Sequence, residues 1–194
     1  DEFTSAFSMH LLCNHIMLQA CVEGMKSEGY GRVINVISTS VKQPLNGLGV
    51  SNTVRGAVAN WSKTMANELG QYNITVNNVL PGATNTARLN SIIANKAEKT
   101  GKNEADVKDG MASIVPMKRV AEPHEVANAI AFLASPAASY INGINVPVDG
   151  GRTRSPAHPP GSRSCSRPAP RPALDRARGR PDRPLARDPR PRCR

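Results

Sequence analysis

The sequence lacks several features that would place the protein outside the cell or in a membrane. No apolar run approaches the roughly 20 residues needed to span a bilayer. The first residues, DEFTSAFSMH, lack the basic-then-apolar pattern of a signal peptide. They begin with Asp1 rather than Met, so we expect the start of the protein to lie upstream.

Cysteines are few and widely separated. Cys13 and Cys21 lie in an apolar segment, whereas Cys165 and Cys193 lie near the other end of the chain. This arrangement is neither a disulfide framework nor a close set of metal ligands. We therefore expect a reducing, cytoplasmic setting.

The last 43 residues, 152–194, have no lysine, no glutamate and no aromatic residue. They hold 13 arginines, 3 aspartates and 10 of the 16 prolines, and so carry the whole net charge of +10. This composition cannot build a core. We expect a folded domain at 1–151 and a disordered basic tail at 152–194. The tail is either an arm that neutralises nucleic-acid phosphates or, as its composition favours, GC-rich DNA read out of frame that binds polyanions only incidentally.

Helical and strand patterns alternate through residues 1–151, with loops at Gly and Pro. The predicted elements are a helix at 6–27, a strand at 33–37, a helix at 50–72, a strand at 74–80, weak helix at 88–113, a helix from Pro123 and a strand at 144–148. Such alternation predicts a parallel α/β sheet with helices on both faces. Three strands make a narrow sheet, so we expect its amino-terminal half to lie outside this sequence.

Three segments carry a family resemblance: GRVINVIS, ITVNNVLPGATNTARL and RVAEPHEVANAIAFLASPAASYINGINVPVDGG. From about Leu12 to Gly151 the chain resembles the short-chain dehydrogenases/reductases, most of all a divergent branch of the 3-oxoacyl-[acyl-carrier-protein] reductases. The resemblance implies a doubly wound Rossmann-type parallel sheet, an NAD(P) cofactor and hydride transfer to or from a carbonyl carbon. It also implies a small-molecule or acyl-thioester substrate, and a homo-oligomer built on helices 6–27 and 50–72.

The family's catalytic Asn, Ser, Tyr and Lys can be carried over position by position. Ser38 matches the substrate-orienting serine, but Ser51 stands at the tyrosine position, Arg55 at the lysine position and His10 at the asparagine position. A phenol is the family's proton donor, and a serine hydroxyl is a far weaker acid with a shorter reach. Arginine stays protonated and passes no proton on. We therefore expect no direct replacement of the Tyr–Lys pair.

Alternative roles exist for these substituted residues. Ser51 fits a helix cap better than a nucleophile, since no His–carboxylate pair lies nearby. Arg55 can pair with an acid, line a subunit interface or bind an anion. His10, Cys13 and His15 do not share one helix face at metal-ligand spacing, so we expect no metal site.

The cofactor half of the family pattern is only partly present. The segment PGATNT keeps Pro81, Gly82 and Thr86, which in the family contact the nicotinamide end of NAD(P). No G-x-x-x-G-x-G phosphate loop follows a strand in this sequence. We therefore expect the isolated chain to be inactive as a reductase. The alternative is a non-catalytic protein of the same fold that serves association or ligand binding.

Overall fold

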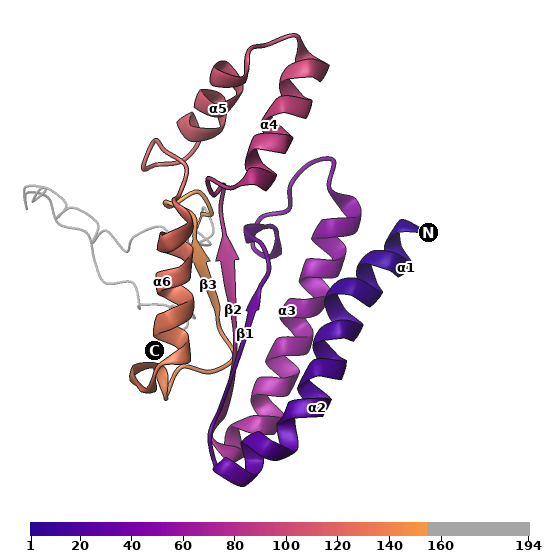
Figure 1. The fold of residues 1–194 in the computed structure, drawn as a ribbon, viewed down its shortest axis with the longest axis vertical. Coiled ribbons are helices and arrows are strands. Elements are labelled where there is room, and N and C mark those ends of the chain that lie inside the picture. Colours follow the sequence, from indigo (N-terminus) through magenta and orange to yellow (C-terminus); the bar gives the residue numbers. More distant parts are fainter. Residues whose placement is uncertain (155–194) are drawn as a thin grey trace, which may run out of the picture. The chain divides into compact units, whose positions relative to one another are not determined.

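A computed structural model describes residues 1–154, and the predicted tail beyond Arg154 lies outside the described residues. Figure 1 shows the arrangement of the elements. They are α1 (Glu2–Phe7), a π-helical turn (Ser8–Leu12), α2 (Cys13–Glu28), β1 (Gly31–Val36), a 3₁₀ turn (Thr39–Val41), α3 (Gly49–Leu69), a 3₁₀ turn (Gly70–Tyr72), β2 (Ile74–Pro81), α4 (Ala87–Thr100), α5 (Glu104–Ser113), α6 (Pro123–Ala134), a 3₁₀ turn (Pro136–Ala138) and β3 (Asn145–Val148).

The predicted α/β class is confirmed. The three strands pair in parallel in the order β1-β2-β3. Helices α2 and α3 cover one face of the sheet and α6 covers the other (Figure 1). Alternate residues of β2 serve the two layers, because side chains of a strand point to opposite faces: Val76 packs with the α2–α3 layer and Val79 with α6.

The first helical segment differs from its prediction. It runs from Glu2 to Glu28 and includes a π-helical turn, so it begins four residues earlier than the spacing indicated. Its apolar positions were expected to be buried, but Leu12 is 45% exposed and Ile16 is 62% exposed, and only Leu18 is fully buried. The hydrophobic spacing predicted the helix correctly, but only the part of its apolar face around Leu18, Val22 and Met25 is covered by other elements among residues 1–154.

The region expected to be weakly helical forms two well-defined helices, α4 and α5. Their composition is largely polar, but they share a separate small core. It consists of Leu89, Ile93, Ala97 and Val107. The two helices lie beyond the carboxyl ends of the strands (Figure 1). Helix α6 begins at Pro123 as predicted, because a proline at the first helical position loses no hydrogen bond.

A row of asparagines crosses the sheet at one level. Asn35 of β1 lies opposite Asn78 of β2, which lies opposite Asn145 of β3. Asn35 Nδ2 donates to Asn78 Oδ1 (3.1 Å), and Asn78 Nδ2 donates to Asn145 Oδ1 (2.8 Å). Asn14 of α2 donates to Asn35 Oδ1 (3.1 Å), and the hydroxyl of Ser62 in α3 accepts from Asn35 Nδ2 (2.9 Å). A strand shifted by one residue would bury these amides without partners, so the row fixes the register.

We expect Asn78→Ala to lower the free energy of unfolding by about 2–3 kcal/mol, because it leaves buried amide groups of its neighbours without partners. Asn78 is 3% exposed. Urea denaturation followed by circular dichroism measures the change. Asn95→Ala on the exposed side of α4 is the matched control. Equal midpoints for the two variants would show that the row does not hold the sheet.

Candidate functional site

A cavity of about 360 Å³ opens at the carboxyl ends of β1 and β2. Ser38, just after β1, lines it together with Pro81 and Gly82 at the end of β2 and Thr86 before α4. Ligands of open parallel sheets bind at this edge, because the loops that follow the strands meet there. The structure thus brings together four of the seven residues that the sequence singled out.

Ser38 is held by the backbone of the turn that follows it. Its backbone is extended, and its Oγ accepts a hydrogen bond from Ser40 N at 3.1 Å. The Val41 amide donates to the Ser38 carbonyl at 3.2 Å. The oxygen therefore caps the 3₁₀ turn while the side chain lines the cavity, so the local structural role and the position at the site coexist.

Gly82 allows β2 to approach β3 closely at the cavity wall. A Cβ on Gly82 would lie 2.9 Å from Asp149 Cα, which is closer than side chains allow. The Gly82 amide donates to the Val148 carbonyl at 2.9 Å. Thr86 caps α4: its Oγ1 accepts from Leu89 N at 3.4 Å. Both residues are therefore fixed by backbone contacts before any ligand binds.

Two of the other three catalytic-position residues line a second hollow. His10, in the π-helical turn, and Ser51, in α3, line a cavity of about 780 Å³ between the first helical segment and the start of α3. Arg88 lines both this hollow and the first cavity. A π-helical turn inside a helix is often found at functional sites. Here it carries His10.

Arg55 lies one turn further along α3 and lines neither cavity. Burial lowers the pKa of its guanidinium. Burial also lowers the pKa of His10, and the positive charge of Arg55 lowers it further. The structure therefore brings His10 and Arg55 within electrostatic reach, with Ser51 lining the same hollow as His10 and Ser38 lining the other cavity.

One interpretation of the substituted residues is wrong. Helix α3 begins at Gly49 without a capping side chain, so Ser51 lies inside the first turn and is not its cap. The loop before α3 is held instead by Asn52, whose Nδ2 donates to the Leu45 carbonyl at 2.8 Å. Arg55 forms no ion pair within residues 1–154, where the two salt bridges join Lys26 to Glu23 and Arg119 to Glu125.

Sequence reasoning missed several residues of the first cavity, namely Thr39, Thr84, Arg88 and Arg152. A signal was available for Arg88, because a cation in the first turn of a helix opposes the usual charge preference. No signal in the sequence pointed to Arg152, which stood in the region assigned to the basic tail.

The sequence family described as Enoyl-(Acyl carrier protein) reductase matches residues 1–153. The chain is 32% identical over 155 residues to the NADPH-dependent reductase BacG of Bacillus subtilis, covering 80% of this chain and 60% of that protein. It is 33% identical over 153 residues to the 3-oxoacyl-[acyl-carrier-protein] reductase FabG of Vibrio harveyi, covering 78% and 57%. The chain belongs to the short-chain dehydrogenase/reductase family. The resemblance expected from its motifs is therefore confirmed.

Solved structures of the family agree with this assignment. The NADPH-dependent reductase YwfH, involved in bacilysin biosynthesis, has a TM-score of 0.74 at 32% identity over 79% of this chain and 59% of its own. L-sorbose reductase of Gluconobacter frateurii, complexed with NADPH and L-sorbose, also has a TM-score of 0.74, at 28% identity over 79% and 59%. This short-chain dehydrogenase/reductase chain thus spans about 60% of the length of these relatives, and matches their carboxyl-terminal part.

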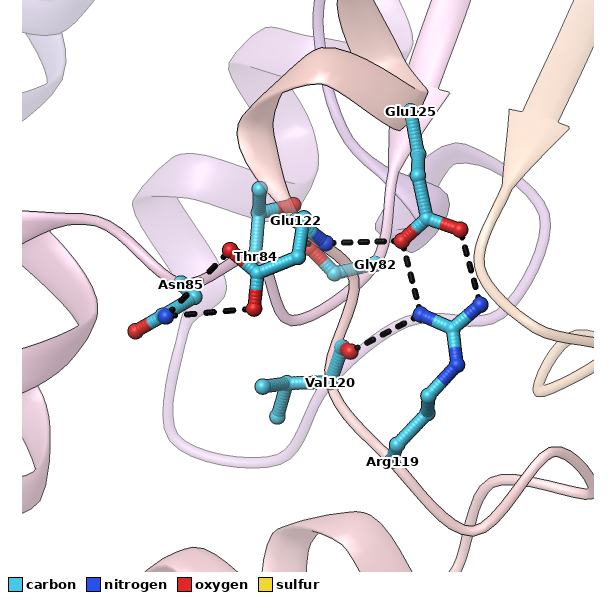
Figure 2. Close-up of polar contacts among 7 residues, drawn as sticks. All are labelled: Gly82, Thr84, Asn85, Arg119, Val120, Glu122 and Glu125. Atoms are coloured by element: carbon cyan, nitrogen blue, oxygen red, sulfur yellow. Dashed lines mark hydrogen bonds and ion pairs between the residues drawn. The ribbon is translucent and has the colours of Figure 1, made fainter.

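A polar network ties the loop after β2 to the start of α6 (Figure 2). Arg119 donates to both carboxylate oxygens of Glu125 at 2.7 Å. Glu125 also accepts from the Glu122 backbone amide at 2.8 Å, and Glu122 accepts from Asn85 Nδ2 at 3.2 Å. The network holds the loop on which Thr84 and Thr86 stand.

The network predicts a pH-dependent stability. Hydrogen bonds from Arg119 lower the pKa of Glu125 from 4.5 to about 2. Because the folded-state pKa is depressed, the stabilisation is complete above about 4.5 and is lost as the pH falls to about 2. We expect Glu125→Gln to have a lower urea midpoint than the parent chain at pH 7, and this difference to shrink as the pH falls from about 4.5 to about 2.

Urea denaturation between pH 2 and pH 7 tests this expectation. Glu98→Gln in α4 is the matched control, because Glu98 is exposed and forms no ion pair within residues 1–154. A difference between Glu125→Gln and the parent chain that stays constant across the whole pH range would contradict the proposed role of the ion pair.

Proposed function

We propose that this chain is the carboxyl-terminal part of an NAD(P)-dependent reductase that acts on a carbonyl or hydroxyl group, of the 3-oxoacyl reductase-like type. The observation that carries the proposal is the cavity that gathers Ser38 with Pro81, Gly82 and Thr86. Family membership supports the chemistry, and the NADPH named for several relatives supports the cofactor.

The cavity suits the nicotinamide end of the coenzyme. Gly82 and Thr86 both line it, and neither contributes a bulky or charged side chain. When bound, the coenzyme supplies or accepts the hydride. In this proposal the Ser38 hydroxyl would orient the substrate oxygen, and Pro81, Gly82 and Thr86 would hold the nicotinamide end. The adenosine end requires a phosphate loop that this 194-residue sequence does not contain.

The residues Ser51 and Arg55 affect the proton-transfer step of the proposed activity. A serine hydroxyl beside a permanently charged guanidinium does not donate a proton near neutral pH as the family's phenol does. Ser51 also lies in the second hollow, with His10, and not in the cavity of Ser38. We therefore propose that the chain by itself does not reduce a carbonyl substrate.

The alternative function is non-catalytic association. It draws on the same substitutions and on the large apolar side chains exposed along the first helical segment, which are Phe3, Phe7, Met9, Leu12, Ile16 and Met17. A protein that keeps the family's helix pair for assembly, without its proton donor, would show this combination.

A fusion tests the catalytic proposal. We expect the amino-terminal part of Bacillus subtilis BacG, joined to this chain in place of the matching segment, to bind NADPH with micromolar affinity in calorimetry. Thr86→Val in the fusion should weaken that binding roughly tenfold, because a polar contact of the hydroxyl is lost. Thr100→Val at the far end of α4 is the matched control.

Two results would contradict the proposal. Failure of a folded fusion to bind NADPH would refute the assignment of the cavity to nicotinamide. Micromolar NADPH binding by the unfused chain, or turnover of an acetoacetyl thioester by its Ser51→Tyr/Arg55→Lys variant, would refute the proposed inactivity. In the fusion, the same double variant should raise thioester turnover.

The first helical segment and α3 are the proposed homo-oligomer interface, within residues 6–27 and 50–72. The exposed apolar side chains of the first segment support this assignment, since unpartnered apolar patches mark association surfaces. We expect Ile16→Glu to shift the protein to smaller species in sedimentation velocity, whereas Gln19→Glu on the same helix leaves the distribution unchanged. If the parent chain stays monomeric when its concentration is raised 100-fold above the lowest concentration measured, the interface is refuted.

No helix within residues 1–154 is long and apolar enough to cross a bilayer.

A further inference from the structure

Among residues 1–154, the charged side chains that line the cavity of Ser38 all have one sign. They are Arg88 and Arg152, and no aspartate or glutamate of that part of the chain lines it. The rest of the wall consists of hydroxyl-bearing residues and of a large apolar part, formed by Leu45, Leu89, Ile92, Met111, Ile114 and Val115. A ligand that fits this lining has an apolar body and a negative charge.

Arg152 is positioned by the turn that follows β3. The Asp149 carboxylate accepts from Gly151 N (2.9 Å), from Thr153 N (2.8 Å) and from Thr153 Oγ1 (2.7 Å). Burial raises the pKa of Asp149, but these hydrogen bonds outweigh it and hold that pKa below its usual value. The turn is therefore closed around a carboxylate that stays charged, and it directs Arg152 to the cavity.

The guanidinium of Arg152 has little to bind within residues 1–154. Its one side-chain contact is from Nη1 to Thr39 Oγ1 at 3.5 Å, which is long for a hydrogen bond. Neither Arg152 nor Arg88 forms a salt bridge in that part of the chain. A guanidinium has five donors arranged to grip a carboxylate with two parallel bonds, so most of the capacity of Arg152 is unused.

Arg88 adds a second positive charge at the mouth of the cavity. It is the second residue of α4, and its side chain is exposed. The amino-terminal end of a helix carries a partial positive charge, so a cation there is unfavourable unless an anion binds nearby. The two arginines thus approach the cavity from different elements, one from the turn after β3 and one from α4.

We propose that this cavity binds a substrate with a carboxylate group on an apolar body, and that Arg152 holds the carboxylate with Arg88 as a second contact. The identification of this ligand as a substrate rests on the proposed function, whereas the binding of a carboxylate does not depend on it. Thr39, the contact of Arg152, directly follows Ser38, so the carboxylate lies on the serine side of the cavity. The nicotinamide side, at Pro81, Gly82 and Thr86, stays free for the coenzyme.

Calorimetric titration of the full chain with cinnamate and with cinnamamide tests the proposal. The two probes share the apolar body and differ in charge. We expect cinnamate to bind at least tenfold more tightly, because it gains charge-assisted hydrogen bonds. Arg152→Gln should remove this preference and leave the affinity for cinnamamide unchanged, and Arg152→Lys should keep part of it. Arg88→Gln should lower the preference by a smaller factor.

Arg154→Gln is the matched control, since Arg154 is exposed, stands two residues away and does not line the cavity. Equal affinity for both probes, or binding of neither, would overturn the proposal. So would an equal loss in Arg154→Gln, which would mean a general effect of the basic chain. Thermal melting checks that the variants are folded.

Inorganic pyrophosphate separates the substrate from the coenzyme as the source of the anion. If Arg152→Gln lowers the affinity for pyrophosphate more than the affinity for cinnamate, the arginine binds coenzyme phosphates and the proposal fails. The proposed reductase function is tested separately, because these titrations contain no NADPH. Loss of NADPH binding in the BacG fusion, with the cinnamate preference intact, would refute the reductase function and leave the carboxylate site standing.

Discussion

Parallel pairing of β1, β2 and β3 is the constraint on which the site depends. Strands that run in one direction bring their carboxyl ends to the same edge of the sheet, and with them Ser38, Gly82 and Asp149. The asparagine row at Asn35, Asn78 and Asn145 fixes the register of this pairing. A slip of one residue would turn every side chain at the strand ends to the opposite face and dismantle the cavity.

The cavity and the catalytic positions differ in how far they keep the residues that the family resemblance predicts. The residues predicted to hold nicotinamide are present and are fixed by backbone contacts, whereas serine and arginine stand where the resemblance predicts the proton-transferring pair. His10 and Arg55 lie within electrostatic reach of each other, and the charged side chains that the described residues 1–154 place in the adjoining cavity are arginines. Binding of an anion and placement of a coenzyme ring are thus better supported by this geometry than proton transfer through Ser51.

The unpartnered surfaces have a common physical origin. The apolar side of the first helical segment and the free edge of β1 both belong to elements that in a larger parallel sheet or an oligomer would be covered. The chain spans about 60% of the length of these relatives. The sequence pattern anticipated a narrow three-stranded sheet, and the structure describes one, with helices on both faces.

The sequence alone determined the element types, the parallel α/β class, the family and the positions of Ser38, Pro81, Gly82 and Thr86, because periodicity and motif spacing are local properties of the chain. It misjudged Leu12 and Ile16, because burial depends on whether another element covers a face. It misassigned Ser51 as a cap, because the helix start was set two residues earlier by the loop packing of Asn52. Arg88 and Arg152 are 64 positions apart in the sequence. Only the tertiary structure brought them to one cavity, because the parallel pairing places the loops after β2 and β3 side by side.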